Sequence, residues 1–251
     1  MTQYKVYGLI GYPLGHSFSR GFFTDKFSAE GINARYENFE LPSIELVSEV
    51  WPVDGLAGLN VTIPYKERII PYLDGLSDEA AAIGAVNVIR IERDPSSPAA
   101  VRRIGYNSDV VGFRESIRPL IGSGHKRALV LGTGGASKAV CHGLATLGVE
   151  PVRVSRDPSR GDLTYDALTP VIMASHTVIV NTTPVGMYPH VDECPDIPYS
   201  LLTPDHLCYD LVYNPEVTTF LRQAARHGAV TKNGAEMLRL QAIEAWRIWN
   251  M

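Results

Sequence analysis

A short apolar run leads directly into a glycine-rich turn at residues 127–136, Arg-Ala-Leu-Val-Leu-Gly-Thr-Gly-Gly-Ala. The apolar part is typical of a buried parallel strand, and a helical pattern follows the turn as far as Leu147, with Gly148 as its stop signal. A strand, a glycine turn and a helix in this order bring the backbone close to a pyrophosphate at the helix N-terminus. Ser137 stands where the G-x-G-x-x-G fingerprint has its third glycine. The segment therefore predicts a doubly wound α/β domain that binds a dinucleotide.

Two arginines follow the next predicted strand, residues 152–155. That strand ends roughly 20 residues past the glycines, where an NAD-binding protein places an acidic residue on the ribose 2′-hydroxyl. Ser155 and Arg156 stand there in this chain, and Arg160 follows. Guanidinium groups bind a 2′-phosphate through charge-assisted hydrogen bonds, although the nearby Asp157 can compete for them. The sequence predicts NADP(H) as the cofactor and leaves open how strictly NAD is excluded.

Residues 58–66, Gly-Leu-Asn-Val-Thr-Ile-Pro-Tyr-Lys, read as a strand that runs into a helix. Apolar residues alternate with Asn60 and Thr62, so the two polar side chains share one face. The proline suits the first turn of a helix, which is expected over residues 64–73. Lys66 then lies at a helix N-terminus, whose partial positive charge is expected to lower its pKa from about 10.4 and make it a proton donor. The alternative is an ordinary strand–helix joint with exposed polar side chains.

Two hydroxyl side chains, Ser17 and Ser19, stand at the start of a helix predicted for residues 20–29. A serine in this place is most often an N-cap. Together with the helix N-terminus, the two hydroxyls could instead receive an anion such as a carboxylate.

Three more polar residues allow either a structural or a functional interpretation. Asn87 interrupts an apolar strand at residues 85–91, Asp109 stands at a predicted helix N-cap, and Gln241 lies on the apolar face of a helix at residues 235–249. Each could simply be a hydrogen-bonded structural group.

The run Asn60-Val-Thr-Ile-Pro-Tyr-Lys66 closely resembles the signature of shikimate dehydrogenases. Further motifs of that family follow in the family's order along nearly the whole chain: Ser17-x-Ser19 after Pro-Leu-Gly-His, Gly-Ala-Val-Asn87, Gly132-x-Gly-Gly-Ala136 and Gly234-x-x-x-Leu-x-x-Gln241. Arg20 departs from the proline usually found after the second serine. In the motif Asn-Thr-Asp-Gly, Ser108 replaces the threonine, and two valines separate Asp109 from the glycine.

The resemblance implies a role for each candidate residue. Lys66 is implied to be catalytic, with Asp109 pairing with it and contacting the hydroxyl that is oxidised. The implied substrate-binding residues are Ser17 and Ser19 for the carboxylate, and Asn60, Thr62, Asn87, Tyr213 and Gln241 for the rest of the substrate. The implied cofactor-binding residues are Gly132, Thr133, Gly134, Gly135, Ala136, Ser155, Arg156, Arg160, Asn181, Thr182, Leu211 and Gly234.

The predicted fold class is α/β with two domains. The first is a substrate-binding α/β domain at residues 1–105, completed by the C-terminal helix at residues 233–251. The second is a Rossmann-like doubly wound domain at residues 106–232. The Pro- and Ser-rich stretch 94–100 is expected to be the tip of a hairpin and not a domain boundary.

Composition excludes several classes of protein. The 251 residues are 45% hydrophobic, enough for a core, and the net charge of −4 offers no basic patch for nucleic acid or an anionic membrane. The 3 cysteines show no spacing typical of disulfides or zinc, so no metal is predicted. Neither a signal peptide nor an apolar run of membrane-spanning length is recognised, which favours a cytoplasmic protein. The sequence leaves open whether the protein is a monomer or a homodimer.

The resemblance to shikimate dehydrogenases implies the function, which is the NADPH-dependent, reversible reduction of 3-dehydroshikimate to shikimate in the biosynthesis of aromatic amino acids. One alternative is a quinate or dual quinate/shikimate dehydrogenase that uses NAD, against which Ser19 and the two arginines argue. Another is a binding protein that senses cofactor or shikimate without turnover. Such a protein would be expected to lose Lys66 or Asp109, and both are present.

Overall fold

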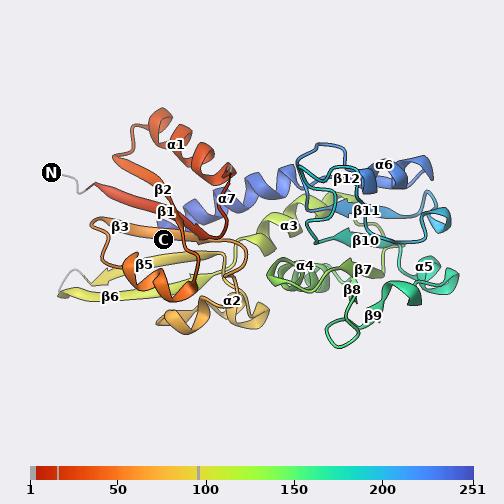
Figure 1. Ribbon diagram of the computed structural model, residues 1–251, viewed down its shortest axis with the longest axis horizontal. Helices are drawn as coiled ribbons and strands as arrows, with labels where there is room; N and C mark the ends of the chain where they lie inside the picture. Colours follow the sequence, from red (N-terminus) through yellow and green to blue (C-terminus); the bar gives the residue numbers. More distant parts are fainter. Residues whose placement is uncertain (1–3, 16, 95–96) are drawn as a thin grey trace. The chain divides into compact units, whose positions relative to one another are not determined.

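The computed structural model describes residues 4–15, 17–94 and 97–251 (Figure 1). The chain divides into two compact units, Met1–Ser108 with Ala242–Met251, and Asp109–Gln241. Both units are α/β, which confirms the predicted fold class. Their bounds lie near the predicted ones, except that the C-terminal helix α7 (Ala235–Trp249) is divided between the two units.

The first unit is built on a mixed sheet in the order β2-β1-β3-β5-β6-β4. β1 pairs in parallel with β2 and β3, whereas β5 pairs antiparallel with β3 and β6. The strands are β1 (Lys5–Gly11), β2 (Ala34–Glu40), β3 (Leu56–Val61), β4 (Gly75–Leu76), β5 (Val88–Asp94) and β6 (Ser97–Tyr106). The helices are α1 (Phe18–Glu30) and α2 (Asp78–Ile83), with 3₁₀ turns η1 (Ile44–Glu49) and η2 (Ile70–Tyr72). β5 and β6 form the expected hairpin, although residues 95–96 of its predicted tip lie outside the described residues.

Two apolar layers cover the faces of this sheet. On one face, α1 and the C-terminal half of α7 pack on β1 and β2 through a cluster of aromatic and aliphatic side chains, in which Phe23 stacks on Tyr36 with ring centroids 5.0 Å apart (Figure 1). η1 and the loop after β3 cover the other face. A Cβ atom on Gly58 would lie 2.3 Å from the Trp249 ring, so this position of β3 must be glycine for α7 to dock. Asn60, two residues after Gly58 on β3, points to the same face of the sheet, which α1 and α7 cover.

The second unit has a six-stranded sheet in the order β12-β11-β10-β7-β8-β9, and all its pairings are parallel. The strands are β7 (Arg127–Leu131), β8 (Glu150–Ser155), β9 (Leu163–Thr164), β10 (Val178–Asn181), β11 (Leu207–Asp210) and β12 (Val230–Lys232). The order reverses between β7 and β10, which is the point where doubly wound sheets bind ligands beyond the carboxyl ends of their strands. This confirms the predicted Rossmann-like domain.

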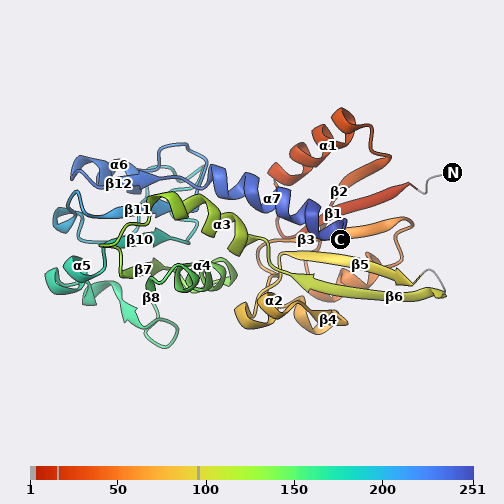
Figure 2. The ribbon, with the colours of Figure 1, turned by 180° about the vertical axis from the view of Figure 1, so that it is seen from behind.

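Helices cover both faces of the second sheet (Figure 2). α3 (Asp109–Ile117), α4 (Gly135–Thr146) and the first turns of α7 bury one face, and α5 (Pro170–Ser175) and α6 (Thr219–Arg226) bury the other. Three short 3₁₀ turns, η3 (Arg118–Leu120), η4 (Tyr165–Ala167) and η5 (Tyr199–Leu201), complete the unit.

The helix predicted for residues 64–73 is wrong. These residues form turns and the short η2, because the Lys66 carbonyl accepts a hydrogen bond from the Val86 N–H (2.7 Å) and not from the N–H four residues ahead. Pro71 also lacks an N–H and disfavours helical backbone at the residue before it.

Candidate active site

Two buried asparagines anchor a polar network on the α1 side of the first sheet. Asn60 on β3 is 5% exposed and Asn87, just before β5, is 3% exposed. The Tyr36 hydroxyl donates to Asn60 Oδ1 (2.8 Å), and Asn60 Nδ2 donates to the Asn87 carbonyl (3.3 Å). Burial raises the pKa of Tyr36, and a hydrogen bond with Ser19 opposes that shift. The fold thus joins three predicted substrate residues, Ser19, Asn60 and Asn87, in one network.

The side chain of Asn87 is held by Ser108. Its Nδ2 donates to Ser108 Oγ (3.0 Å), and its Oδ1 accepts from the Ser108 N–H (2.7 Å). An amide side chain has two donor and two acceptor positions, and the hydrogen bonds of the described residues occupy one of each. Asn87 is therefore both a structural amide and a group with hydrogen-bonding capacity left for a ligand.

Ser17 is the N-cap of α1, as the structural interpretation predicts. Its Oγ accepts from the Arg20 N–H (3.2 Å), and Gly31 ends the helix in the left-handed conformation. This bond uses Ser17 only as an acceptor, so its hydroxyl hydrogen can still be donated to an anion at the helix start. Ser19 is the second residue of the helix, so its hydrogen bond with Tyr36 is not an N-cap interaction.

Lys66 follows a turn that the core fixes. Tyr65 is buried and donates its hydroxyl to the Leu41 carbonyl, and the Thr62 N–H donates to the Ile10 carbonyl (2.9 Å). Lys66 and Thr62 are both half-buried. No α-helix begins here, so the predicted effect of a helix dipole on Lys66 does not apply. The backbone of Lys66 is instead held by the hydrogen bond from the Val86 N–H to its carbonyl.

Asp109 and Gln241 are both buried within the second unit. Asp109 is the first residue of α3, where a carboxylate interacts favourably with the helix dipole. Gln241 donates Nε2 to the Leu238 carbonyl (2.9 Å). A Cβ atom on Gly112 would lie 3.0 Å from the Gln241 backbone nitrogen, so glycine permits α3 and α7 to approach closely.

The glycine turn after β7 fits the pyrophosphate of a dinucleotide. Gly132 has φ of 112°, and a Cβ atom there would lie 2.7 Å from Thr182 Oγ1, which donates to the Leu131 carbonyl (2.7 Å). Gly134 is the N-cap residue of α4 and has no side chain that could accept from the helix N–H groups. A Cβ atom built on Gly134 would meet no atom within 4 Å. There is thus space beside Gly134 at the N-terminus of α4, where backbone N–H groups favour an anion, although the Ser137 N–H already donates to the Gly134 carbonyl (3.0 Å). Thr133, Gly135 and Ala136 lie in the same turn.

The loop after β8 presents two exposed arginines, Arg156 and Arg160. Ser155 is buried and accepts from the Asp157 N–H (3.1 Å). The Asp157 carboxylate accepts from the Ser159 hydroxyl (2.7 Å) and N–H (2.9 Å), and these bonds hold its pKa below the ordinary value. Arg160 also interacts electrostatically with Asp157 and lowers its pKa, so Asp157 is bound to Ser159 and still attracts one of the two guanidinium groups.

Asp210, which the sequence analysis did not select, is at the centre of a second buried network. It is completely buried and accepts from Asn181 Nδ2 (2.9 Å), the Val212 N–H (3.0 Å) and Thr218 Oγ1 (2.6 Å). Asn181 Oδ1 in turn accepts from the Thr183 N–H (3.1 Å). These bonds hold the loops after β10 and β11, which contain Thr182 and Leu211. The signal in the sequence is an acidic residue that ends an otherwise apolar strand.

Leu211 and Gly234 also approach each other closely. A Cβ atom on Gly234 would lie 2.1 Å from the Leu211 carbonyl oxygen, so no larger residue fits at Gly234. Tyr213, two residues further along the loop, is exposed.

Replacement of Asp210 by asparagine is expected to change how stability depends on pH. Burial raises the pKa of Asp210 to about 6, whereas an unfolded aspartate has a pKa of about 3.9. Protonation of the Asp210 carboxyl group therefore stabilises the folded state fully below about pH 4. This stabilisation is lost as the pH rises through about 6. A pKa difference of about 2 corresponds to about 3 kcal/mol. Urea unfolding at pH 4 and pH 7 measures this effect. The free energy of unfolding of Asp210→Asn, relative to that of wild type, should be higher at pH 7 than at pH 4 by about 3 kcal/mol. An equal relative stability at both pH values would refute the raised pKa of Asp210.

Neither a metal centre nor a membrane span is found. Within residues 4–15, 17–94 and 97–251, no three His, Cys, Asp or Glu side chains are grouped to hold a metal ion. The same part of the chain contains no helix of the length and apolarity needed to cross a membrane.

Known proteins resemble this chain over nearly its whole length. Residues 9–89 match the shikimate dehydrogenase substrate binding domain. The shikimate dehydrogenase (NADP(+)) of Carboxydothermus hydrogenoformans is 35% identical over 262 residues, which cover 98% of this chain and 91% of the relative. The structure of shikimate 5-dehydrogenase from Thermus thermophilus in complex with NADP(H) and shikimate is 30% identical, with a TM-score of 0.82 and coverage of 98% and 93%. Quinate dehydrogenase from Corynebacterium glutamicum in complex with NAD has a TM-score of 0.84 at 28% identity, with the same coverage. The chain belongs to the shikimate dehydrogenase family.

Proposed function

We propose that this protein catalyses the reversible, NADPH-dependent reduction of 3-dehydroshikimate to shikimate in aromatic amino acid biosynthesis. The observation that carries the proposal is the network of the half-buried Ser19 with the buried Asn60 and Asn87. The half-buried Lys66 is held next to it in the fold, because its carbonyl accepts from the N–H of Val86, the residue before Asn87. Such a set offers amide and hydroxyl groups to a polyhydroxylated ring and an ammonium group to an oxygen that gains negative charge. Family membership supports this assignment.

The substrate's carboxylate is proposed to bind Ser17 and Ser19 at the start of α1, where hydroxyl donors and the helix dipole favour an anion. Asn60, Thr62 and Asn87 are proposed to bind the ring hydroxyls, together with Tyr213 and Gln241. Because the Asn87 side chain is already held by Ser108, it meets the substrate without first losing side-chain freedom.

The chemical step is proposed to depend on Lys66 and Asp109. The bound cofactor would supply the hydride, from C4 of its nicotinamide, that reduces the ring carbonyl. Lys66 donates a proton to the carbonyl oxygen, or stabilises the negative charge that develops there. Asp109 orients the ammonium group and the reacting oxygen. The glycine turn after β7, together with Arg156 and Arg160, is proposed to hold the pyrophosphate and the 2′-phosphate of the cofactor.

A quinate dehydrogenase that uses NAD is the second candidate, since a structure of that description has a TM-score of 0.84 to this protein. Two exposed arginines after β8 favour NADP, because each offers a charge-assisted bond to the 2′-phosphate. Initial rates with shikimate and quinate, each with NADP and with NAD, separate the two candidates. The highest kcat/KM is expected for shikimate with NADP, and a preference for quinate with NAD would overturn the proposal.

Removal of the hydroxyls at the start of α1 is expected to raise KM for shikimate. Ser17→Ala and Ser19→Ala should leave kcat nearly unchanged, because a carboxylate is bound alike in the ground and transition states. Ser17→Ala should also cost about 1 kcal/mol of stability through the lost N-cap, whereas Ser19→Ala removes no cap. Steady-state kinetics and urea unfolding of both variants measure these effects, and an unchanged KM would mean that the carboxylate binds elsewhere.

A further inference from the structure

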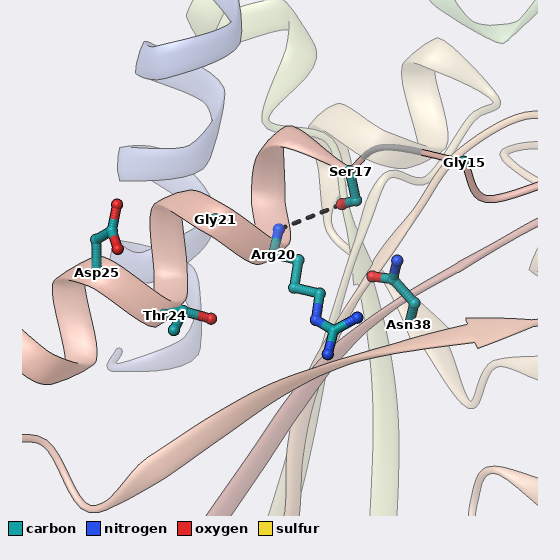
Figure 3. A pocket seen from close by; sticks show the side chains of 7 residues that line it. All are labelled: Gly15, Ser17, Arg20, Gly21, Thr24, Asp25 and Asn38. Atoms are coloured by element: carbon teal, nitrogen blue, oxygen red, sulfur yellow. Dashed lines mark hydrogen bonds between the residues drawn. The ribbon is translucent and has the colours of Figure 1, made fainter.

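A hollow lies between α1 and β2 in the first unit, beside the two serines. Its volume is about 370 Å³, and its lining residues are Gly15, Ser17, Arg20, Gly21, Thr24, Asp25 and Asn38 (Figure 3). Ser17 stands where α1 begins, and the Arg20 side chain extends from the helix toward β2, where Asn38 is located (Figure 3). The hollow therefore has the proposed carboxylate-binding Ser17 and the exposed Arg20 among its lining residues.

Two polar groups of this hollow, on Asn38 and Arg20, have no partner in the described part of the chain. Asn38 Oδ1 is buried and has no hydrogen-bond partner there. The Arg20 guanidinium forms no hydrogen bond or ion pair among the described residues, since the one bond of Arg20 to a side chain uses its backbone N–H. A positive charge that lines a hollow attracts an anion. Asn38 Oδ1 is itself an acceptor, so it is satisfied by a donor such as a ligand hydroxyl and not by a carboxylate.

The hollow continues the polar face of the first sheet. Leu9 on β1 pairs with Asn38 on one side and Asn60 on the other, and side chains in register on parallel strands point to the same face. Tyr36 precedes Asn38 by two residues on that face and hydrogen-bonds Ser19. Asn38, which lines the hollow together with Arg20, and Tyr36, which hydrogen-bonds Ser19, are thus roughly 7 Å apart along β2. The hollow and the Ser19 hydroxyl therefore lie on the same face of the sheet.

We propose that Arg20 is a specificity-determining residue, which binds the substrate's carboxylate together with Ser17 and Ser19. This inference rests on the proposed function and deepens it. A guanidinium group binds a carboxylate through two parallel hydrogen bonds, which the proline usual at this position cannot make. Arg20 makes the enzyme select an acid over a neutral analogue of the same shape. Asp25, which lines the same hollow, opposes this attraction.

Kinetics with an acid and a neutral substrate test the proposal. Arg20→Met should raise KM for shikimate about 10-fold or more and leave kcat within about two-fold, because charge-assisted bonds to a carboxylate are lost in ground and transition states alike. KM or the inhibition constant for shikimate methyl ester should not change. Arg20→Lys keeps the charge without the planar pair of donors, so its KM should lie between those of wild type and Arg20→Met. Asp25→Asn should lower KM for shikimate.

Arg35→Met serves as the matched control, since Arg35 is an exposed arginine of β2 that does not line the hollow, and its KM should equal that of wild type. Equal changes for the acid and the ester in Arg20→Met, or an unchanged KM for shikimate, would overturn the role of Arg20. If wild type does not oxidise shikimate, both the proposed function and the proposed role of Arg20 are overturned. If wild type oxidises shikimate and Arg20→Met has the same KM for shikimate, only the role of Arg20 is overturned.

Discussion

Replacement of Lys66 by methionine is expected to lower kcat by about 10²- to 10⁴-fold with little change in KM for shikimate. Proton transfer by a positioned side chain contributes rate enhancement of that size, and the interaction is made mainly with charge that develops in the transition state. Methionine keeps much of the length of the lysine side chain and removes its charge. The backbone at residue 66 should stay in place, because the hydrogen bond from Val86 ends on the Lys66 carbonyl.

Lys66→Met is to be compared with Lys5→Met, which removes an exposed lysine at the start of β1 and should have wild-type kinetics. Circular dichroism and NADP binding verify that both variants are folded. A folded Lys66→Met variant with near-normal kcat would exclude proton transfer by Lys66.

Removal of Arg156 or Arg160 is expected to weaken the use of NADP by roughly 10- to 150-fold in kcat/KM, with the use of NAD nearly unaffected. A hydrogen bond to a charged group contributes about 1.5–3 kcal/mol, which corresponds to that range. Both side chains are exposed, so solvent screening favours the lower end for each single variant. The double variant should lose more, since Asp157 then remains charged near the 2′-phosphate.

Arg153→Ala is the matched control for these variants. Arg153 lies on β8 just before the same loop, but its guanidinium group is paired with Asp162 through two hydrogen bonds (3.0 and 3.1 Å). Its loss should change kcat/KM for NADP and NAD by the same factor. Equal losses with both cofactors in Arg156→Ala and Arg160→Ala would mean that these arginines support the loop and do not bind the phosphate.

The sequence was sufficient to predict elements whose backbone conformation depends on residues close together in the chain. Ser17 and Gly31 cap α1, and Ser77 and Gly84 cap α2, as the positions of serine and glycine predict. The second unit was predictable because an apolar strand, a glycine turn and a helix form one continuous segment. Its parallel order then follows from repeated strand–helix connections.

Long-range contacts explain what the sequence did not predict. The turn at Lys66 depends on Val86, which is twenty positions away, and the alternating pattern before it gives no sign of that bond. The Asp210 carboxylate accepts hydrogen bonds from Asn181 and Thr218, which lie on two other segments of the chain. This network therefore forms only when the protein folds. Pro71 was a local signal against a helix and should have shortened the predicted one.

Transfer of deuterium from labelled cofactor tests the proposed reaction most directly. NADPH that carries two deuterium atoms at C4 is mixed with 3-dehydroshikimate and the protein, and the product is analysed by mass spectrometry and NMR. We expect shikimate with a single deuterium atom, bound to the carbon that was the ring carbonyl, formed in equal amount with NADP. Shikimate without deuterium at that carbon, or no shikimate while the folded protein binds NADPH, would contradict the assignment of this protein as an NADP-dependent shikimate dehydrogenase.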